Sequence, residues 1–319
     1  MDSLMYSLNA TLPVFLVMVL GYALKQMGML NENFVTVANK FNFKVTLPFM
    51  LFRDISSVDI RQVFDGKYVL FCALASTACC WLIRGMTKLF VKDRSLRGAF
   101  VQGSFRSSAA VMGLAFIQNI YGESAMGPLM IIGAVPLYNI FSVIVLTFEA
   151  QPEEGAAGKR DMSKIREACI NILKNPIIIA IALGLVTALI GIDFPAVIDT
   201  TVNNVAKMAT PLALVALGAG FEGRKALAKM GPTLWAALIK LVFQPALLLP
   251  LAVWMGFTGE KMIGILIMLA SPTTPSCYIM AKNMRNDGVL TASIVVTTTL
   301  LGAFTLTAWI FILRSLGLI

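Results

Sequence analysis

The sequence predicts an all-α integral membrane protein in which ten transmembrane helices form two inverted repeats of five. Three observations predict this: 58% of the 319 residues are hydrophobic and only 13% are charged, ten apolar segments follow one another, and the chain resembles itself at a fixed offset. A soluble domain has about 45–50% apolar and about 25% charged residues. Ten spans of about 20 residues leave room for short connections and none for a soluble domain.

Composition also excludes several classes of function. The net charge of +9 could suit a nucleic-acid partner, but basic loops beside lipid explain it, so we expect none. Histidine is absent, which removes the usual general base and the commonest metal ligand. We therefore expect no enzyme activity, no metal and no cofactor. The five cysteines lie mostly in apolar segments without metal-like pairing, so we expect small buried side chains.

Charge clusters and stretches of Gly, Pro, Asn and Asp separate the ten predicted helices. No basic region precedes the first helix and no cleavage-like site follows it, so we expect a span and not a signal peptide. The predicted helices are Leu8–Met27, Val37–Phe52, Tyr68–Leu89, Arg97–Ile120, Ala125–Phe148, Pro176–Ile190, Thr200–Phe221, Thr233–Met255, Met262–Ala281 and Val289–Leu313.

Loop charges predict the orientation. Of the 26 Lys and Arg residues, 16 fall in the loops of one side, five in those of the other side, and five within spans. Because Lys/Arg-rich loops stay cytoplasmic, we expect a multi-pass protein of the cell membrane, plasma or inner, with both termini outside. Residues 149–174 then form a cytoplasmic linker that ends in an amphipathic helix over Met162–Lys174.

An internal repeat divides the chain into residues 1–148 and 175–319, joined by residues 149–174. Five spans per half is an odd number, so the second half crosses the membrane in the opposite sense. Inverted repeats are typical of secondary transporters, whose site lies near the midplane. A register of 163 residues pairs Pro13 with Pro176, Gly21 with Gly184, Gly28 with Gly191, Lys44 with Lys207, and Pro48 with Pro211.

Polar segments lie at equivalent places in the fourth and ninth spans. The ninth contains Ser271-Pro272-Thr273-Thr274-Pro275-Ser276, and its two prolines predict a break in the helix. The fourth contains Arg106-Ser107-Ser108, and Gly113 follows; the register places Ser108 on Ser271. We expect two discontinuous helices that cross at the midplane with half-helix N-termini toward an anion. The alternative is a kinked helix whose Ser and Thr residues pack against neighbours.

Charges inside the spans indicate the substrate class. All 17 acidic residues fall at span ends or in loops, which disfavours proton coupling through a carboxylate and leaves a lysine-based or substrate-carried proton open. Lys40 and Lys240 lie close enough to the cytoplasmic edge to snorkel. Lys44, Lys207 and Arg106 lie deeper, where a substrate carboxylate could pair with them; helix capping or snorkelling is the alternative.

The chain resembles the auxin efflux carrier family, which includes plant auxin exporters and bacterial carriers proposed for malonate and related organic acids. The residues that carry the resemblance are Leu47-Pro48, Pro211-Leu212-Ala213-Leu214 with Leu217-Gly218-Ala219, Gly113, Tyr121-Gly122, Ser271-Pro272, Tyr278, Ala281 and Asp287.

The resemblance implies a bile-acid symporter-like or NhaA-like fold with broken crossover helices 4 and 9. Helices 1, 2, 6 and 7 would form a scaffold, often a dimer contact, and helices 3–5 and 8–10 a transport domain that moves as an elevator. One departure concerns the crossover. The family's Arg-x-Asn and Gly-x-Pro are here Arg106-Ser107-Ser108 and Gly113-Leu114-Ala115, so Ser108 can meet a substrate carboxylate only with a shorter reach.

We therefore expect a secondary transporter of small organic anions, auxin-like or dicarboxylates such as malonate or malate, in the lipid bilayer and with a homodimer through the scaffold as its assembly. A sodium-coupled symporter of the same fold is the first alternative, because freed carbonyls and the Thr273 and Thr274 hydroxyls could coordinate Na⁺. A channel comes next. The predicted substrate-binding residues are Arg106, Ser107, Ser108, Gly113, Ser271, Pro272, Thr273, Thr274, Pro275, Ser276, Lys44 and Lys207.

Overall fold

The computed structural model describes residues 2–57, 65–109, 126–150, 169–192 and 194–319. Every regular element in these ranges is a helix, and no strand occurs among them. Four of the described helices are long and apolar enough to cross a membrane: Gly66–Thr87, Met126–Phe148, Met230–Trp254 and Gly288–Ser315. Two shorter apolar helices cover Leu12–Gln26 and Pro176–Ile190. The all-helical fold of a membrane protein agrees with the composition.

The N-terminal part consists of α1 (Asp2–Gln26) and a second, compound helix. This helix begins with α2 (Glu32–Phe41), where the Asn31 side chain accepts a hydrogen bond from the backbone N–H of Phe34 (2.9 Å). It continues through η1, a π-helical turn over Asn42–Thr46, into α3 (Leu47–Ser56). The helical backbone therefore extends past Phe52, where the predicted second span ends.

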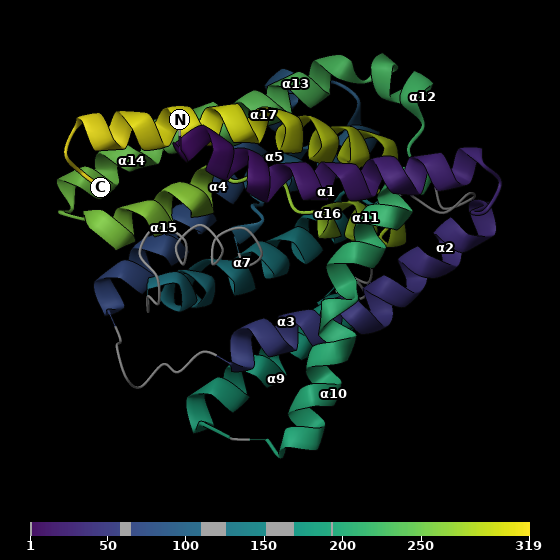
Figure 1. Cartoon of the computed structure of the whole chain (residues 1–319), viewed down its shortest axis with the longest axis horizontal. Helices are drawn as coiled ribbons and strands as arrows, with labels where there is room; N and C mark the ends of the chain where they lie inside the picture. Colours follow the sequence, from purple (N-terminus) through teal and green to yellow (C-terminus); the bar gives the residue numbers. More distant parts are fainter. Residues whose placement is uncertain (1, 58–64, 110–125, 151–168, 193) are drawn as a thin grey trace.

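The corresponding segment of the second half contains α9 (Pro176–Ile190), α10 (Ala196–Lys207) and α11 (Ala209–Ala219). Figure 1 shows α3, α9 and α10 grouped together, and α3 contacts both of the other helices. Helix α1 packs against α11.

Glycines bring these helices into close contact. A Cβ atom on Gly218 of α11 would lie 1.9 Å from the Met18 carbonyl oxygen of α1, and one on Gly21 would lie 2.4 Å from the Val215 oxygen. Gly184 of α9 faces Ile55 of α3 in the same way, with 3.1 Å from the added Cβ to the Ile55 Cβ. Small residues allow such helix packing in membranes. Gly21 and Gly184, which the 163-residue register pairs, thus each pack against a helix of the other half.

The remaining helices surround two short, buried ones, α5 (Arg97–Phe105) and α15 (Gly259–Ala270). Residues 98–105 and 262–270 of these two helices are all buried, and α4, α7 and α17 contact both. The other elements are α4 (Gly66–Phe90), η2 (Arg94–Leu96), α7 (Met126–Phe148), α12 (Gly223–Ala228), α13 (Met230–Leu238), the π-helical turn η4 (Ile239–Phe243), α14 (Gln244–Trp254), α16 (Ser276–Asn283) and α17 (Gly288–Ser315).

Both predicted crossover helices are interrupted. Helix α15 ends at Ala270 and α16 begins at Ser276, so the break that the two prolines predict is confirmed. The fourth predicted helix, Arg97–Ile120, stops at Phe105, because Arg106 adopts extended backbone angles (φ −84°, ψ 130°). The chain beyond Ala109, including Gly113, lies outside the described residues, as do residues 151–168 with most of the predicted amphipathic helix.

Candidate functional site

The two interruptions meet in space. The backbone N–H of Ser108 donates a hydrogen bond to the carbonyl oxygen of Pro272 (2.9 Å). The Thr273 hydroxyl donates to the Gly103 carbonyl of α5 (2.7 Å), and the Thr273 N–H donates to the Thr298 hydroxyl of α17 (3.1 Å). Backbone groups released from one helix are therefore partly satisfied by the other, as buried polar groups require.

Arg106 lies at this crossing and is 4% exposed. Its guanidinium donates to the side-chain oxygen of Asn139 in α7 (2.7 Å) and to the hydroxyl of Ser276 at the start of α16 (2.8 Å). It also approaches the sulfur of Met280 (2.7 Å). Asn139 is held by its own bond to the Val135 carbonyl (2.9 Å), which turns its oxygen toward Arg106. No ion pair among the described residues includes Arg106.

A small cavity of about 30 Å³ opens beside Arg106. The crossing, helix α7 and helix α3 all contribute to its wall, so it lies between the interrupted helices and the group of α3, α9 and α10. The lining residues are Met50, Leu51, Asp54, Arg106, Ser107, Ser108, Ala109, Val135, Tyr138, Asn139, Thr274 and Ser276.

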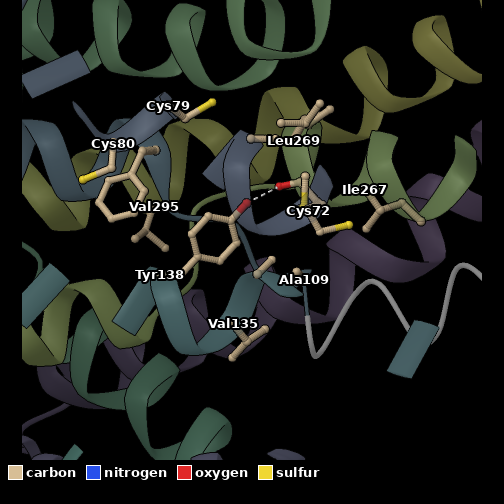
Figure 2. Close-up of a cluster of buried hydrophobic side chains, with 14 of the residues drawn as sticks. Cys72, Cys79, Cys80, Ala109, Val135, Tyr138, Ile267, Leu269 and Val295 are labelled. Atoms are coloured by element: carbon tan, nitrogen blue, oxygen red, sulfur yellow. Dashed lines mark hydrogen bonds between the residues drawn. The ribbon is translucent and has the colours of Figure 1, made fainter. Parts of the chain in front are cut away.

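Tyr138 connects the cavity wall with the packed interior. Figure 2 shows its ring among the buried side chains of Cys72, Val135 and Val295, with its hydroxyl bonded to a carbonyl oxygen. That oxygen belongs to Met268 of α15 (2.8 Å), and it also accepts a hydrogen bond from the Ser107 hydroxyl. One carbonyl near the end of α15 therefore fixes two side chains of the cavity.

The structure brings part of the predicted site together. Arg106, Ser107, Ser108, Thr274 and Ser276 line the cavity. Ser271, Pro272, Thr273 and Pro275 form the interruption of the ninth helix but do not line it. Lys44 and Lys207 are exposed and are also absent from the lining, and Gly113 is outside the described residues.

Three polar residues near the cavity were not predicted. Asn139 is a strongly polar side chain within an apolar span, and this was the available signal for it. The apolar segment stops at Phe52, so the sequence predicts Asp54 outside the second span, but α3 continues to Ser56 and carries Asp54 into the lining. The third is Lys240.

The snorkelling prediction is wrong for Lys240. Its side chain is 0% exposed and lies beside the crossing, where oxygen atoms from three segments accept its hydrogen bonds. Snorkelling assumes that only water can solvate the ammonium group, and here the protein supplies the oxygen atoms. Lys40, by contrast, is exposed.

Apolar helices around a buried polar crossing, with a cavity beside a buried cation, are typical of membrane transporters as a class. The sequence matches the model of a family described as membrane transport protein over residues 6–310. The chain belongs to this family, that of the auxin efflux carriers.

Relatives extend over nearly the whole chain. The uncharacterized transporter YfdV of Escherichia coli is 24% identical over 317 residues, covering 98% of this chain and 99% of the relative. The uncharacterized transporter MJ1031 of Methanocaldococcus jannaschii is 22% identical, covering 98% and 100%. A Rhizobium meliloti protein named "Putative malonate transporter" is 22% identical, covering 95% of each. These names and the family indicate a transporter and not an enzyme.

Proposed function

We propose that the chain is a secondary transporter of small organic anions, auxin-like or dicarboxylates such as malonate or malate, that works by elevator-type alternating access. The observation that supports this most is Arg106, a buried cation on the cavity wall that takes part in no ion pair of the described residues. A buried charge needs a counter-charge, and a substrate carboxylate supplies one. The name of the Rhizobium meliloti relative makes malonate the first substrate to test.

The elevator proposal assigns the predicted spans 1, 2, 6 and 7 to a scaffold, which also carries the homodimer contact. In the structure these spans correspond to α1, α2 with α3, α9, and α10 with α11. The predicted spans 3–5 and 8–10 form the mobile transport domain. It draws support from the cavity, whose wall combines α3 with α7 and the crossing. The two domains would each combine both inverted repeats, residues 1–148 and 175–319, linked by residues 149–174, with both termini outside the cell. A cavity between two groups of helices can change sides when one group slides past the other.

Uptake of radiolabelled malonate into proteoliposomes tests the role of Arg106. We expect Arg106→Ala to lower uptake roughly ten- to hundredfold, the loss expected when a charged hydrogen-bond donor is removed. Arg106→Lys should recover part of the uptake, because it restores the charge without the planar group. The control is Arg224→Ala, which removes an exposed arginine of α12.

Wild-type rates in Arg106→Ala would contradict the proposed site. Saturable uptake and counterflow distinguish the transporter from a channel, which predicts neither. A parallel assay with labelled indole-3-acetate separates the auxin-like substrates from the dicarboxylates.

A further inference from the structure

The cavity and Arg106 leave the buried Lys240 without a role. This residue lies in η4, the π-helical turn between α13 and α14. Its ammonium nitrogen donates to the Leu269 carbonyl (2.7 Å) and to the Ser107 hydroxyl, with the Phe105 carbonyl and the Gln244 side-chain oxygen at 3.4 Å each. No ion pair of the described residues includes Lys240.

Each of the four hydrogen-bond partners of this nitrogen presents an oxygen lone pair. The amide nitrogen of Gln244 donates to the Ser104 carbonyl (2.5 Å), so its oxygen is the atom that faces Lys240. The Ser107 hydroxyl gives its proton to the Met268 carbonyl and therefore accepts from Lys240. An ammonium group has three donors and no acceptor, and these surroundings suit it.

Two of the four oxygens lie at the ends of the interrupted helices. Phe105 is the last residue of α5, and Leu269 is the next-to-last residue of α15. The C-terminal ends of helices carry partial negative charge, and in transporters with broken helices such ends coordinate Na⁺. Lys240 thus occupies the kind of oxygen cluster that a coupling ion would use.

We propose that the Lys240 ammonium is a tethered cation that replaces the coupling ion, so that transport needs no sodium. This inference rests on the proposed function, since it concerns the same crossing. It selects against the sodium-coupled symporter, because the Leu269 and Phe105 carbonyls already accept hydrogen bonds from Lys240. It also makes Lys240 a specificity residue for the ion and not a group that touches the substrate, because it is absent from the cavity lining.

The test compares malonate uptake in sodium medium and in choline medium for the wild type, Lys240→Met and the control Lys92→Met, which changes an exposed lysine. The wild type and the control should transport equally in both media. Lys240→Met should lose on the order of tenfold in choline, as expected for a lost charged hydrogen-bond donor, and regain uptake in sodium. Lys240→Gln, which is neutral but keeps an N–H donor, should respond in the same direction and serves if the Met variant does not fold.

A second readout does not depend on transport. Sodium should raise the Tm of the purified Lys240 variants relative to choline and leave the wild-type Tm unchanged, because Lys240 holds the oxygens of this cluster in the wild type and the variants release them. Wild-type uptake or a wild-type Tm that responds to sodium would overturn the proposal, and so would variants that gain no sodium response in the Tm assay. If the wild type takes up no malonate, the proposed substrate fails while the Tm comparison still decides the role of Lys240.

Discussion

Asp54 and Arg106 bring opposite charges to one cavity. Asp54 comes from α3 and Arg106 from the end of α5, and both line the wall. No ion pair of the described residues includes Asp54. When Asp54 is ionised, an anion that approaches Arg106 also meets a like charge in the cavity lining, and this limits how tightly a dianion is held. A transporter must also release its substrate, and a nearby carboxylate favours release.

Replacing Asp54 by Asn should lower the KM for malonate by about three- to tenfold, since it removes a like charge from the cavity. The measurement is concentration-dependent uptake in alkaline buffer, which keeps the carboxyl group ionised in the wild type. Asp54→Glu retains the charge and should keep the wild-type KM. Loss of uptake in Asp54→Asn with recovery in Asp54→Glu would instead assign the carboxyl group a part in the transport cycle.

Among the elements, α17 contacts the interruption of the ninth helix and helps to hold it in place. Thr298 of this helix accepts the hydrogen bond from the Thr273 N–H, and Gly302 leaves room for the ring of Pro272. A Cβ atom on Gly302 would lie 2.6 Å from the Pro272 Cγ, and a proline ring has little freedom to move aside. The position of Pro272 matters because its carbonyl holds the Ser108 backbone.

Gly302→Ala should therefore destabilise the protein by about 1–3 kcal/mol, as overpacking does, and lower malonate uptake at the same time. Thermal unfolding in detergent and proteoliposome uptake measure the two effects. Gly85→Ala is the matched control, because Gly85 lies inside α4 with no atom within 4 Å of an added Cβ. It should be neutral or stabilising by up to about 1 kcal/mol. Equal Tm values for the two variants would show that α17 does not constrain Pro272.

Asp65 joins the first turns of α4 and α15. Its carboxylate accepts a hydrogen bond from the Tyr68 backbone N–H (3.0 Å), which caps α4, and one from the Lys261 ammonium group of α15 (2.5 Å). The bond from Lys261 and the backbone bond from Tyr68 lower the pKa of Asp65. A carboxyl group whose pKa is lower in the folded protein stabilises it above the unfolded pKa, and this contribution disappears as pH falls through the folded value.

The Tm of the wild type should therefore exceed that of Asp65→Asn at neutral pH, and the difference should shrink below pH of about 4, the ordinary range for Asp. Asn still caps a helix, so this variant isolates the ion pair, whereas Asp65→Ala also removes the cap and should lose about 1 kcal/mol more. Differential scanning fluorimetry across pH measures both. A difference that stays constant with pH would exclude the ion pair as its source.

Across the whole molecule, the sequence predicted features that depend on local chemistry. Prolines 272 and 275 predicted the break in the ninth helix, because a proline ring removes a backbone donor and clashes with the preceding turn. The register that pairs Ser108 with Ser271 anticipated that the two interruptions meet, and the hydrogen bond from Ser108 to Pro272 confirms the contact. The family resemblance is confirmed over residues 6–310.

The features that were missed depend on packing between distant segments. The distance of Lys240 along the chain from the nearest charged loop predicts snorkelling, but its burial depends on the ends of α5 and α15, which only the folded chain brings to it. Asp54 was misplaced because hydrophobicity marks where apolar residues stop and not where a helix stops. Side chains such as Lys44 and Lys207 align in the repeat, and alignment alone does not say which face of a helix meets the cavity.

Lys240 also bears on how the chain enters the membrane. Its helical segment, Met230–Trp254, is long and apolar enough to cross a membrane, but placing one lysine at the centre of an isolated span costs about 2.5–3.5 kcal/mol. During synthesis this segment leaves the ribosome before α15, so the Leu269 carbonyl that accepts a hydrogen bond from Lys240 does not yet exist. The Phe105 carbonyl and the Ser107 hydroxyl have already been made. The first half of the protein must therefore be available to shelter the lysine during biogenesis, and the second half cannot be expected to insert stably by itself.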